Sequence, residues 1–154
     1  MKSKITNMAS IKEVLPNYIN LDKMTAKKVR ALVQEDEYIS KLGGYKFLFK
    51  ISIYLSIKYG IEITDNKIKT NDNLFRTKEL DDHELLNLMA HYEKIDKNFL
   101  RKNLLDKNID DDDRADSLKD MMKYYEKLFH YGFSIFYPEY SDKKSNYISE
   151  LLLD

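Results

Sequence analysis

The sequence predicts a mainly α protein, a single compact helical domain of about five helices over residues 1–154. First, the most apolar stretch, residues 45–60, has the length of an ordinary helix. Second, three further segments repeat apolar residues at helical spacing, and few segments alternate as strands do. Third, 154 residues with 43% hydrophobic side chains are enough to bury one core.

The first forty residues predict an arm followed by a helix. Residues 1–20 are interpreted as a loosely packed N-terminal arm, in which Pro16 interrupts a short apolar segment with one helical turn on each side. Residues 21–42 place apolar side chains along one helix face, although residues 29–33 also fit a brief strand. Gly43 and Gly44 then break the chain.

Residues 45–60 are the predicted hub of the core. Their apolar residues alternate with lysines and serines, which is the period of a half-buried strand. Leu48, Ile51 and Leu55 also share one helical face, and Gly60 stands where a helix C-cap glycine belongs. Because the run is long for a strand in a small domain, we interpret it as a helix.

The middle of the chain predicts a loop or edge hairpin and then a capped helix. Ile61 and Ile63 alternate with polar residues, so residues 61–69 form either a loop or a short hairpin strand. Asp81 or Asp82 then caps a helix that runs to about Asp96. Residues 99–109 indicate another short helix or an ordered connector.

The clearest helical pattern follows the acidic residues 110–113. Apolar side chains mark one stripe from Leu118 to Phe136, and we expect Pro138 to end the helix. Gly132 lies within the stripe, which indicates a close helix crossing. Residues 141–154 predict a final short helix and a candidate partner-docking tail, because their apolar side chains must cover either this chain or a partner.

Charge and composition indicate a cytoplasmic protein without a membrane span. The formal net charge is zero, but residues 1–50 hold ten Lys/Arg against five Asp/Glu, so a basic patch is expected there. The absence of cysteine fits a reducing compartment. Lysines and serines interrupt the best apolar stretch, and the first residues lack the apolar core of a signal peptide.

No residue pattern predicts catalysis, a metal site or a cofactor. The residue four after His83 is Asn87, so the two-histidine zinc spacing is absent. Residues 110–113 and Asp116 lack the glycine and final glutamate of a calcium loop, and an acidic helix start explains them more simply. Phosphate-binding glycine patterns are missing as well. We therefore expect a protein that is not an enzyme and binds no cofactor.

Two surfaces are candidates for binding. Six of the twelve tyrosines fall within the last thirty-one residues, and tyrosine is enriched at protein interfaces. The predicted partner-binding residues are Tyr124, Tyr131, Tyr137, Tyr140, Tyr147, Leu151 and Leu152. A basic face in the first half of the chain would bind nucleic acid, including DNA, through phosphate contacts. Its predicted residues are Lys23, Lys27, Lys28, Arg30 and Lys41.

Three blocks of the sequence, in order, carry a family resemblance. They are FLF to YG within residues 47–60, LLNLM at residues 85–89 and YYEKLFHYGF at residues 124–133. Together they resemble small accessory proteins found with bacterial DNA phosphorothioation (Dnd) and related anti-phage defence clusters. Those proteins have a Phe-rich helix that ends at a glycine, a mid-chain helix of Leu/Ile and acidic residues, and a late E-x-Y-A-x-x-G helix. Phe129 and His130 stand where that family has small residues.

The resemblance implies a biological context and partners, because the family has no active-site residues to carry over. On this basis we expect a non-catalytic accessory or bridging subunit of a bacterial anti-phage defence complex, bound to a larger ATPase or nuclease subunit. The alternatives are a nucleic-acid-binding module that uses the basic face, and a small phage-encoded inhibitor protein.

Overall fold

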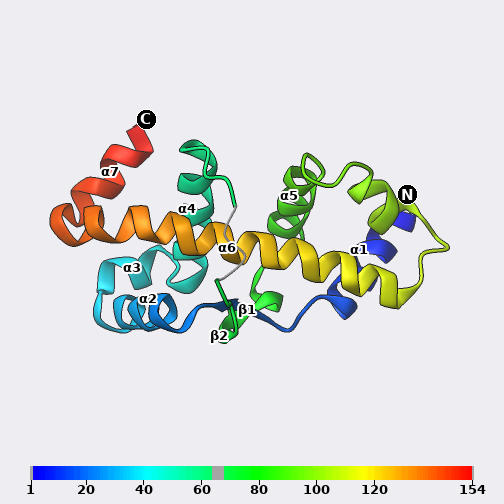
Figure 1. The fold of residues 1–154 in the computed structure, drawn as a ribbon, viewed down its shortest axis with the longest axis horizontal. Helices are drawn as coiled ribbons and strands as arrows, with labels where there is room; N and C mark the ends of the chain where they lie inside the picture. The colour runs from blue at the N-terminus through cyan, green and yellow to red at the C-terminus, as the bar shows by residue number, and fades with distance from the viewer. Residues whose placement is uncertain (1, 64–67, 154) are drawn as a thin grey trace. The chain divides into compact units, whose positions relative to one another are not determined.

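The protein is mainly helical, which confirms the predicted fold class (Figure 1). The computed structural model describes residues 2–63 and 68–153. Its elements are α1 (Lys2–Val14), β1 (Tyr18–Leu21), α2 (Lys23–Glu35), α3 (Glu37–Leu42), α4 (Tyr45–Lys58), β2 (Asp72–Arg76), the 3₁₀ turn η1 (Thr77–Glu79), α5 (Asp82–Tyr92), the π-helical turn η2 (Arg101–Leu105), α6 (Asp111–Lys143) and α7 (Ser145–Leu153).

The chain divides into two compact units. Unit 1 comprises Met1–Ile19 and Phe75–Tyr124, and unit 2 comprises Asn20–Leu74 and Tyr125–Asp154. The long helix α6 therefore contributes its first part to unit 1 and its remainder to unit 2.

Unit 1 begins with a helix that the sequence analysis did not predict. The expected kink at Pro16 is wrong, because α1 ends at Val14 and Pro16 lies between that helix and β1. Ile11 and Ile19 have no solvent exposure, so this N-terminal segment contributes to the core of unit 1. Helix α1 packs against η2.

Aromatic rings and one buried amide join the helices of unit 1. The Tyr92 ring on α5 lies 4.9 Å from the Phe99 ring and 5.5 Å from the Tyr124 ring. The fully buried Asn103 on η2 donates to the Ser117 hydroxyl at 3.1 Å. Asp81 caps α5 as predicted, since its carboxylate accepts from the Glu84 amide at 2.8 Å.

The two strands lie at positions other than those predicted. β1 and β2 form a two-stranded sheet, whereas residues 29–33 lie inside α2. A strand there is wrong because Thr25, Ala26 and Val29 bury one face at helical spacing. Of the predicted strand at 61–69, residues 64–67 lie outside the described residues, and 61–63 and 68–69 are not in a strand.

In unit 2, helices α2, α3 and α4 pack against one another. The single helix expected over 21–42 is interrupted at Asp36, which caps α3 by accepting from the Ile39 amide at 3.1 Å. The second carboxylate oxygen of Asp36 accepts from the Tyr140 hydroxyl at 2.8 Å. One aspartate thus caps α3 and fastens it to α6.

Helix α4 confirms the helical interpretation of residues 45–60. Its end is a Schellman motif, in which the Gly60 amide donates to the Ile57 carbonyl and the Ile61 amide donates to the Ser56 carbonyl. Gly60 has φ 61, a left-handed conformation that glycine adopts at less steric cost than other residues. Phe49 of α4 packs edge-on against Phe129 of α6, with ring centroids 5.5 Å apart.

The close helix crossing predicted at Gly132 is confirmed. A Cβ atom placed on Gly132 would overlap the backbone carbonyl of Ser52 and lie 2.8 Å from its Cα. Helices α4 and α6 therefore touch backbone to backbone at this point. The Ser56 hydroxyl, one turn further along α4, donates to the Leu128 carbonyl at 2.6 Å.

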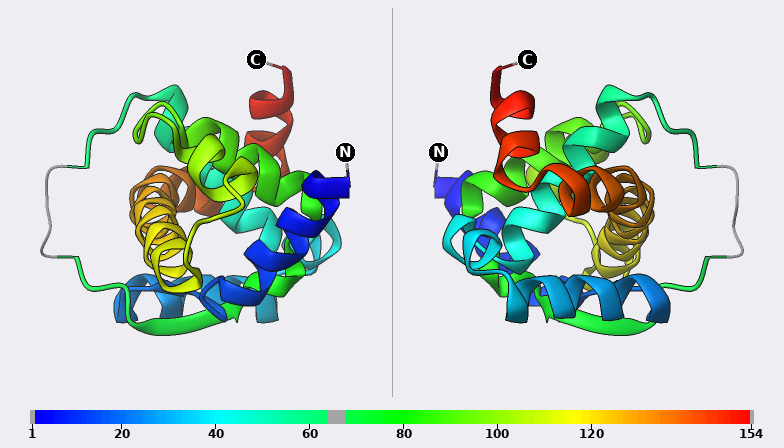
Figure 2. Two further views of the ribbon diagram at one scale, coloured as in Figure 1. Left: turned by 90° about the vertical axis from the view of Figure 1, so that its right-hand side faces the viewer. Right: turned by 90° about the vertical axis from the view of Figure 1, so that its left-hand side faces the viewer.

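The prediction that Pro138 ends the last long helix is wrong, because α6 continues to Lys143. An interior proline costs about 3 kcal/mol, and buried aromatic contacts on either side of Pro138 offset this cost. The Phe136 and Tyr140 rings stack at 5.3 Å with an interplanar angle of 11°. After Lys144, which has φ 54, the chain turns into α7, the predicted final helix (Figure 2).

Candidate functional site

Unit 2 contains a groove of about 710 Å³ bordered by the end of α4, the last turns of α6 and α7. We call it the C-terminal groove. Its lining residues are Tyr59, Ile61, Ser134, Ile135, Pro138, Glu139, Lys143, Tyr147, Glu150 and Leu151. A recess of this size can hold the side chains of a bound peptide segment or a small molecule.

The charged residues of the C-terminal groove are paired with one another. The Lys143 ammonium lies 3.4 Å from a carboxylate oxygen of Glu139 and 3.4 Å from one of Glu150. Hydrogen bonding to Glu139 and the charge of Glu150 raise the pKa of Lys143 above its usual range. Two carboxylates facing one ammonium leave the groove with one net negative charge.

Tyrosines supply both the rim and the base of the groove. Tyr59 follows the last turn of α4 and is 58% exposed. Tyr147 of α7 is only 6% exposed, and burial raises its pKa to about 12. The groove therefore presents an open aromatic edge above a buried, neutral phenol.

The predicted partner-binding residues divide into three groups. Tyr140, Tyr147 and Leu151 are buried, and Tyr124, Tyr131 and Tyr137 are half-buried. Leu152 is 80% exposed. Of the seven, Tyr147 and Leu151 line the C-terminal groove.

The structure places part of the predicted tyrosine surface in the core. Tyr140 is 1% exposed, its ring stacks on Phe136 and its hydroxyl donates to Asp36, both within unit 2. The expectation that it faces a partner is therefore wrong, because an aromatic on the buried stripe of α6 packs inward. Tyr59 and Ile61 were not predicted as site residues, although their position beside the helix-ending Gly60 is a signal for an exposed helix end.

The predicted basic face is only partly assembled. Lys23, Lys27 and Lys28 are exposed on α2, and Lys41 is exposed on α3. Arg30 is committed elsewhere, since its guanidinium binds both carboxylate oxygens of Asp72 at 2.8 and 3.3 Å. Its hydrogen bond holds the pKa of Asp72 below the usual range.

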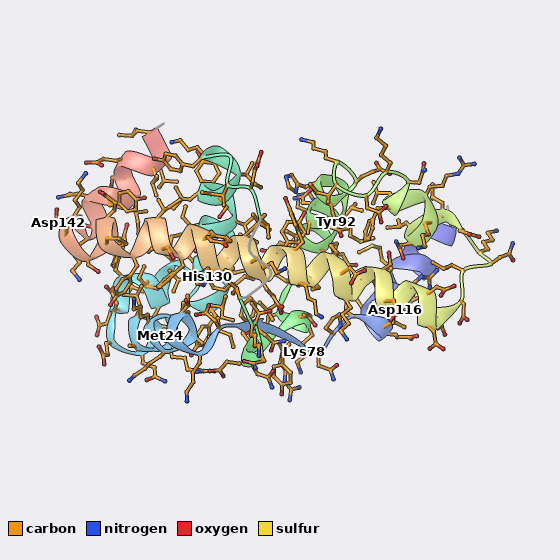
Figure 3. All side chains as sticks on the ribbon, viewed as in Figure 1. Met24, Lys78, Tyr92, Asp116, His130 and Asp142 are labelled. Atoms are coloured by element: carbon orange, nitrogen blue, oxygen red, sulfur yellow. The ribbon has the colours of Figure 1, made fainter. Side chains whose placement is uncertain are left out.

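A polar cluster in unit 2 joins the start of α2 to α6. Asp22 caps α2, and its carboxylate lies 2.6 Å from Nδ1 of His130. His130 is labelled on α6 in Figure 3. The Thr25 hydroxyl donates to the same carboxylate at 2.9 Å. Burial opposes ionisation of Asp22, but hydrogen bonds from Thr25 and His130 hold its pKa below the usual range. The cluster therefore links α2 to α6 through Asp22, the residue that caps α2.

The acidic run and the histidines noted in the sequence lie at helix starts and ends. Asp110 precedes α6, and its carboxylate accepts from the Asp112 amide at 3.1 Å. His83 is exposed in the first turn of α5, whereas burial lowers the pKa of His91 in its last turn. Within residues 2–63 and 68–153, no group of three or more His, Cys, Asp or Glu side chains is placed to hold a metal ion.

No protein-family model matches this chain, and neither a curated protein nor a solved structure matches it. In the part of the chain that the structure describes, none of the helices combines the length and the apolar character required to cross a bilayer. The resemblance to accessory proteins of anti-phage defence clusters stays a prediction.

Proposed function

We propose that this chain is a non-catalytic accessory subunit of a bacterial anti-phage defence complex that acts in the cytoplasm. It joins the complex by docking onto a larger ATPase or nuclease subunit. The docking site is the C-terminal groove of unit 2. The single observation that carries the proposal is this open groove with an exposed aromatic edge.

The family resemblance supports the biological context. Its three blocks fall on α4, α5 and α6, and the family has helices in the same order. The first block ends in the Gly60 turn, as the Phe-rich helix of that family ends at a glycine.

The groove supports docking of a protein segment rather than a charged small molecule. Its one lysine is already paired with Glu139 and Glu150, so an anionic ligand would gain little from it. Apolar side chains instead gain about 25 cal/mol for each Å² they remove from water. Tyr59, Ile61 and Ile135 offer such surface, and an exposed tyrosine is a common anchor at protein interfaces.

Charge selects among protein segments. Glu139 and Glu150 have side chains 49% and 57% exposed and share one lysine. A partner segment with apolar side chains and a Lys or Arg beside them would compensate the remaining negative charge. We therefore infer an amphipathic, basic segment of the larger subunit as the occupant.

Co-expression with the products of neighbouring genes tests this function. A complex of defined stoichiometry is expected, measured by size-exclusion chromatography with light scattering. Tyr59→Asp should weaken the complex at least about tenfold, because it removes the aromatic anchor and places a carboxylate, which loses its hydration on docking, at the apolar edge of the groove. The proposal fails if the chain stays separate from each neighbouring product.

A matched control is available in unit 1. Ile95 is 54% exposed, close to the 58% of Tyr59, and lies outside the groove. Ile95→Asp should leave the complex unchanged. Equal weakening by both variants, while circular dichroism shows that both are folded, would remove the groove as the docking site.

Nucleic-acid binding is the second candidate, favoured by the exposed lysines of α2. Lys23 and Lys27 are one helical turn apart, and Lys28 lies 5.5 Å from the Tyr137 ring. Charge reversal at Lys27 and Lys28 should weaken DNA or RNA binding and reduce its dependence on salt. Gel-shift titration at low salt checks this, and the absence of any shifted species would remove the candidate.

A further inference from the structure

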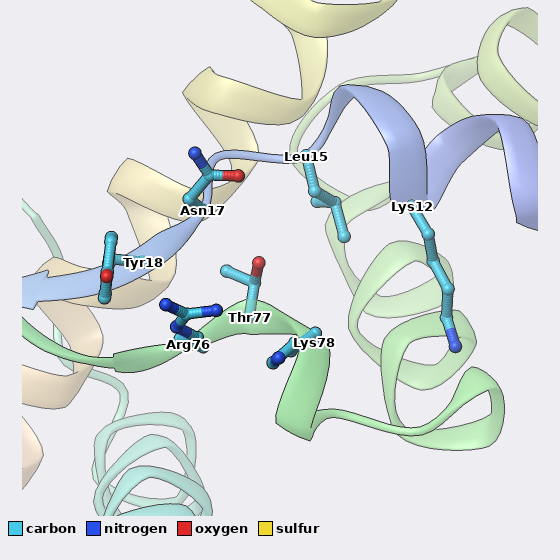
Figure 4. Close-up of a pocket in the computed structure, with 7 residues that line it drawn as sticks. All are labelled: Lys12, Leu15, Asn17, Tyr18, Arg76, Thr77 and Lys78. Atoms are coloured by element: carbon cyan, nitrogen blue, oxygen red, sulfur yellow. The ribbon is translucent and has the colours of Figure 1, made fainter.

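Unit 1 holds a second recess of a different kind, a pocket of about 310 Å³ beside the start of β1 (Figure 4). We call it the cationic pocket. Its lining residues are Lys12, Leu15, Asn17, Tyr18, Arg76, Thr77 and Lys78. Three of the seven are cations, although the whole chain has no net charge.

Thr77 builds the floor of the cationic pocket. Its hydroxyl donates to the Pro16 carbonyl at 2.6 Å, and its amide donates to the Asn17 carbonyl at 3.0 Å. Thr77 is 5% exposed, so both bonds are shielded from water. These two bonds hold Asn17 beside the segment that carries Arg76 and Lys78.

The cations of the pocket differ in what neutralises them. Lys12, on α1, forms an ion pair with Asp82. Within the described residues, neither the Arg76 guanidinium nor the Lys78 ammonium has a carboxylate partner. The Arg76 guanidinium instead lies 5.7 Å over the Tyr18 ring, and Glu79 accepts from the Arg76 amide at 3.3 Å.

Stacking on Tyr18 prepares Arg76 for an anion. A cation–π contact restrains the long side chain without using its N–H donors, so the guanidinium N–H groups of Arg76 remain available to bind a ligand. Arg30 in unit 2 shows the opposite case, because its guanidinium already donates two hydrogen bonds to the carboxylate of Asp72. An arginine fork matches two oxygens of a phosphate group, and a nearby ammonium adds a second charge.

We propose that the cationic pocket binds a small phosphorylated ligand of mononucleotide size. Arg76 and Lys78 hold the phosphate group, and the Asn17 amide offers one further polar contact. Leu15 and the Tyr18 ring provide apolar surface for the organic part. The volume lies at the lower end of the range for small-molecule sites, which fits a mononucleotide better than a larger cofactor.

Isothermal titration calorimetry of the full chain with AMP, inorganic phosphate and adenosine tests the proposal. AMP should bind more tightly than inorganic phosphate, and adenosine should bind at least about tenfold more weakly than AMP, because charge-assisted hydrogen bonds hold the phosphate. Arg76→Ala should weaken AMP binding about 10- to 100-fold, and Arg76→Lys should weaken it less.

Two lysine variants distinguish binding of AMP in the cationic pocket from a general attraction of AMP to positive charge on the protein surface. Lys78→Ala changes an exposed side chain and should also weaken AMP binding, while Lys123→Ala, at an exposed site on α6 outside the pocket, should not. Circular dichroism should show unchanged folding for all variants. Equal affinity in the Arg76→Ala chain, equal weakening by Lys123→Ala, or no AMP binding at millimolar concentration would overturn the proposal.

A single-stranded oligonucleotide is the remaining arm of the experiment. An oligonucleotide that binds no more tightly than AMP supports a small ligand. Binding that is much tighter and rises with oligonucleotide length would mean that the ligand is a nucleic acid, and the proposal would be wrong. The result is independent of docking at the C-terminal groove, because the two recesses share no residue.

Discussion

The two recesses of this protein use charge in opposite ways. In the C-terminal groove of unit 2, Lys143 is shared between Glu139 and Glu150, and the other lining residues are largely apolar. In the cationic pocket of unit 1, Arg76 and Lys78 have no carboxylate partner among the described residues. Satisfied charge with apolar walls suits a protein segment, whereas unsatisfied positive charge suits a small anion.

The two units also differ in what maintains each recess. Unit 2 depends on close helix packing, which brings α4 against α6 at Gly132. Unit 1 depends on the Thr77 hydrogen bonds that join two short extended segments. Substitutions that remove one kind of support should therefore affect one recess more than the other.

The largest effect is expected at Gly132. Gly132→Ala gains about 1 kcal/mol in helix propensity, but its Cβ would overlap the Ser52 carbonyl. We expect a net loss of about 3 kcal/mol in the free energy of unfolding, measured by urea denaturation. Ser134→Ala, at an exposed site on the same helix, is the control and should change stability by less than about 0.5 kcal/mol. Near-equal stability of the two variants would contradict the close crossing.

Next in size is the contrast between two neighbouring leucines of α7. Leu151 is 8% exposed and lines the C-terminal groove, whereas Leu152 is 80% exposed. Leu151→Ala should cost about 2 kcal/mol, and Leu152→Ala less than about 0.5 kcal/mol. Thermal unfolding followed by circular dichroism measures both. If Leu152→Ala were the more destabilising change, α7 would have to pack through its other face.

A smaller effect is expected at Thr77 in unit 1. Thr77→Val keeps the shape of the side chain but leaves the Pro16 carbonyl without its hydroxyl donor, at a cost of about 1–2 kcal/mol. It should also weaken AMP binding, while docking at the C-terminal groove stays unchanged. Urea denaturation and the calorimetry above provide the two measurements. Unchanged AMP affinity would mean that the cationic pocket does not need this support.

The smallest effect is expected at Asp22 and depends on pH. Asn is as good an N-cap as Asp, so Asp22→Asn removes mainly the charge that faces His130 and Thr25. Because the folded pKa of Asp22 is lowered, its ionisation stabilises unit 2 above the unfolded pKa, and the gain is lost as pH falls through the folded pKa. The variant should be about 0.5–1 kcal/mol less stable at pH 7, since the pair is partly exposed. The difference should vanish in acid, and a constant difference from pH 7 to pH 2 would contradict this.

Structural features that depend on one residue and its neighbours along the chain could be predicted from the sequence. Helix caps, helix-ending turns and close helix crossings require particular residue types, so they could be predicted from the sequence. The examples are the cap Asp81 at the start of α5, the turn at Gly60 after α4 and the crossing at Gly132 within α6. The helix end predicted at Pro138 is wrong because the local cost of the proline is offset by packing of Phe136 and Tyr140, which spacing alone does not reveal.

The candidate sites depended on contacts between distant parts of the chain. The cationic pocket joins residues 12–18 to residues 76–78, and the C-terminal groove joins Tyr59 to α6 and α7. Neither set forms a motif along the sequence. The tyrosine count pointed to the C-terminal part of the chain, where Tyr147 lines the groove, but it did not distinguish the buried Tyr140 from the exposed Tyr59, because exposure depends on the tertiary fold.

Hydrogen–deuterium exchange of the assembled complex tests docking at the C-terminal groove most directly. Docking there predicts slower exchange, on complex formation, in peptides that cover residues 57–61 and 145–153. Peptides from α2 should be unchanged. Protection confined to α2, with residues 57–61 and 145–153 exchanging as in the free chain, would contradict docking at the C-terminal groove.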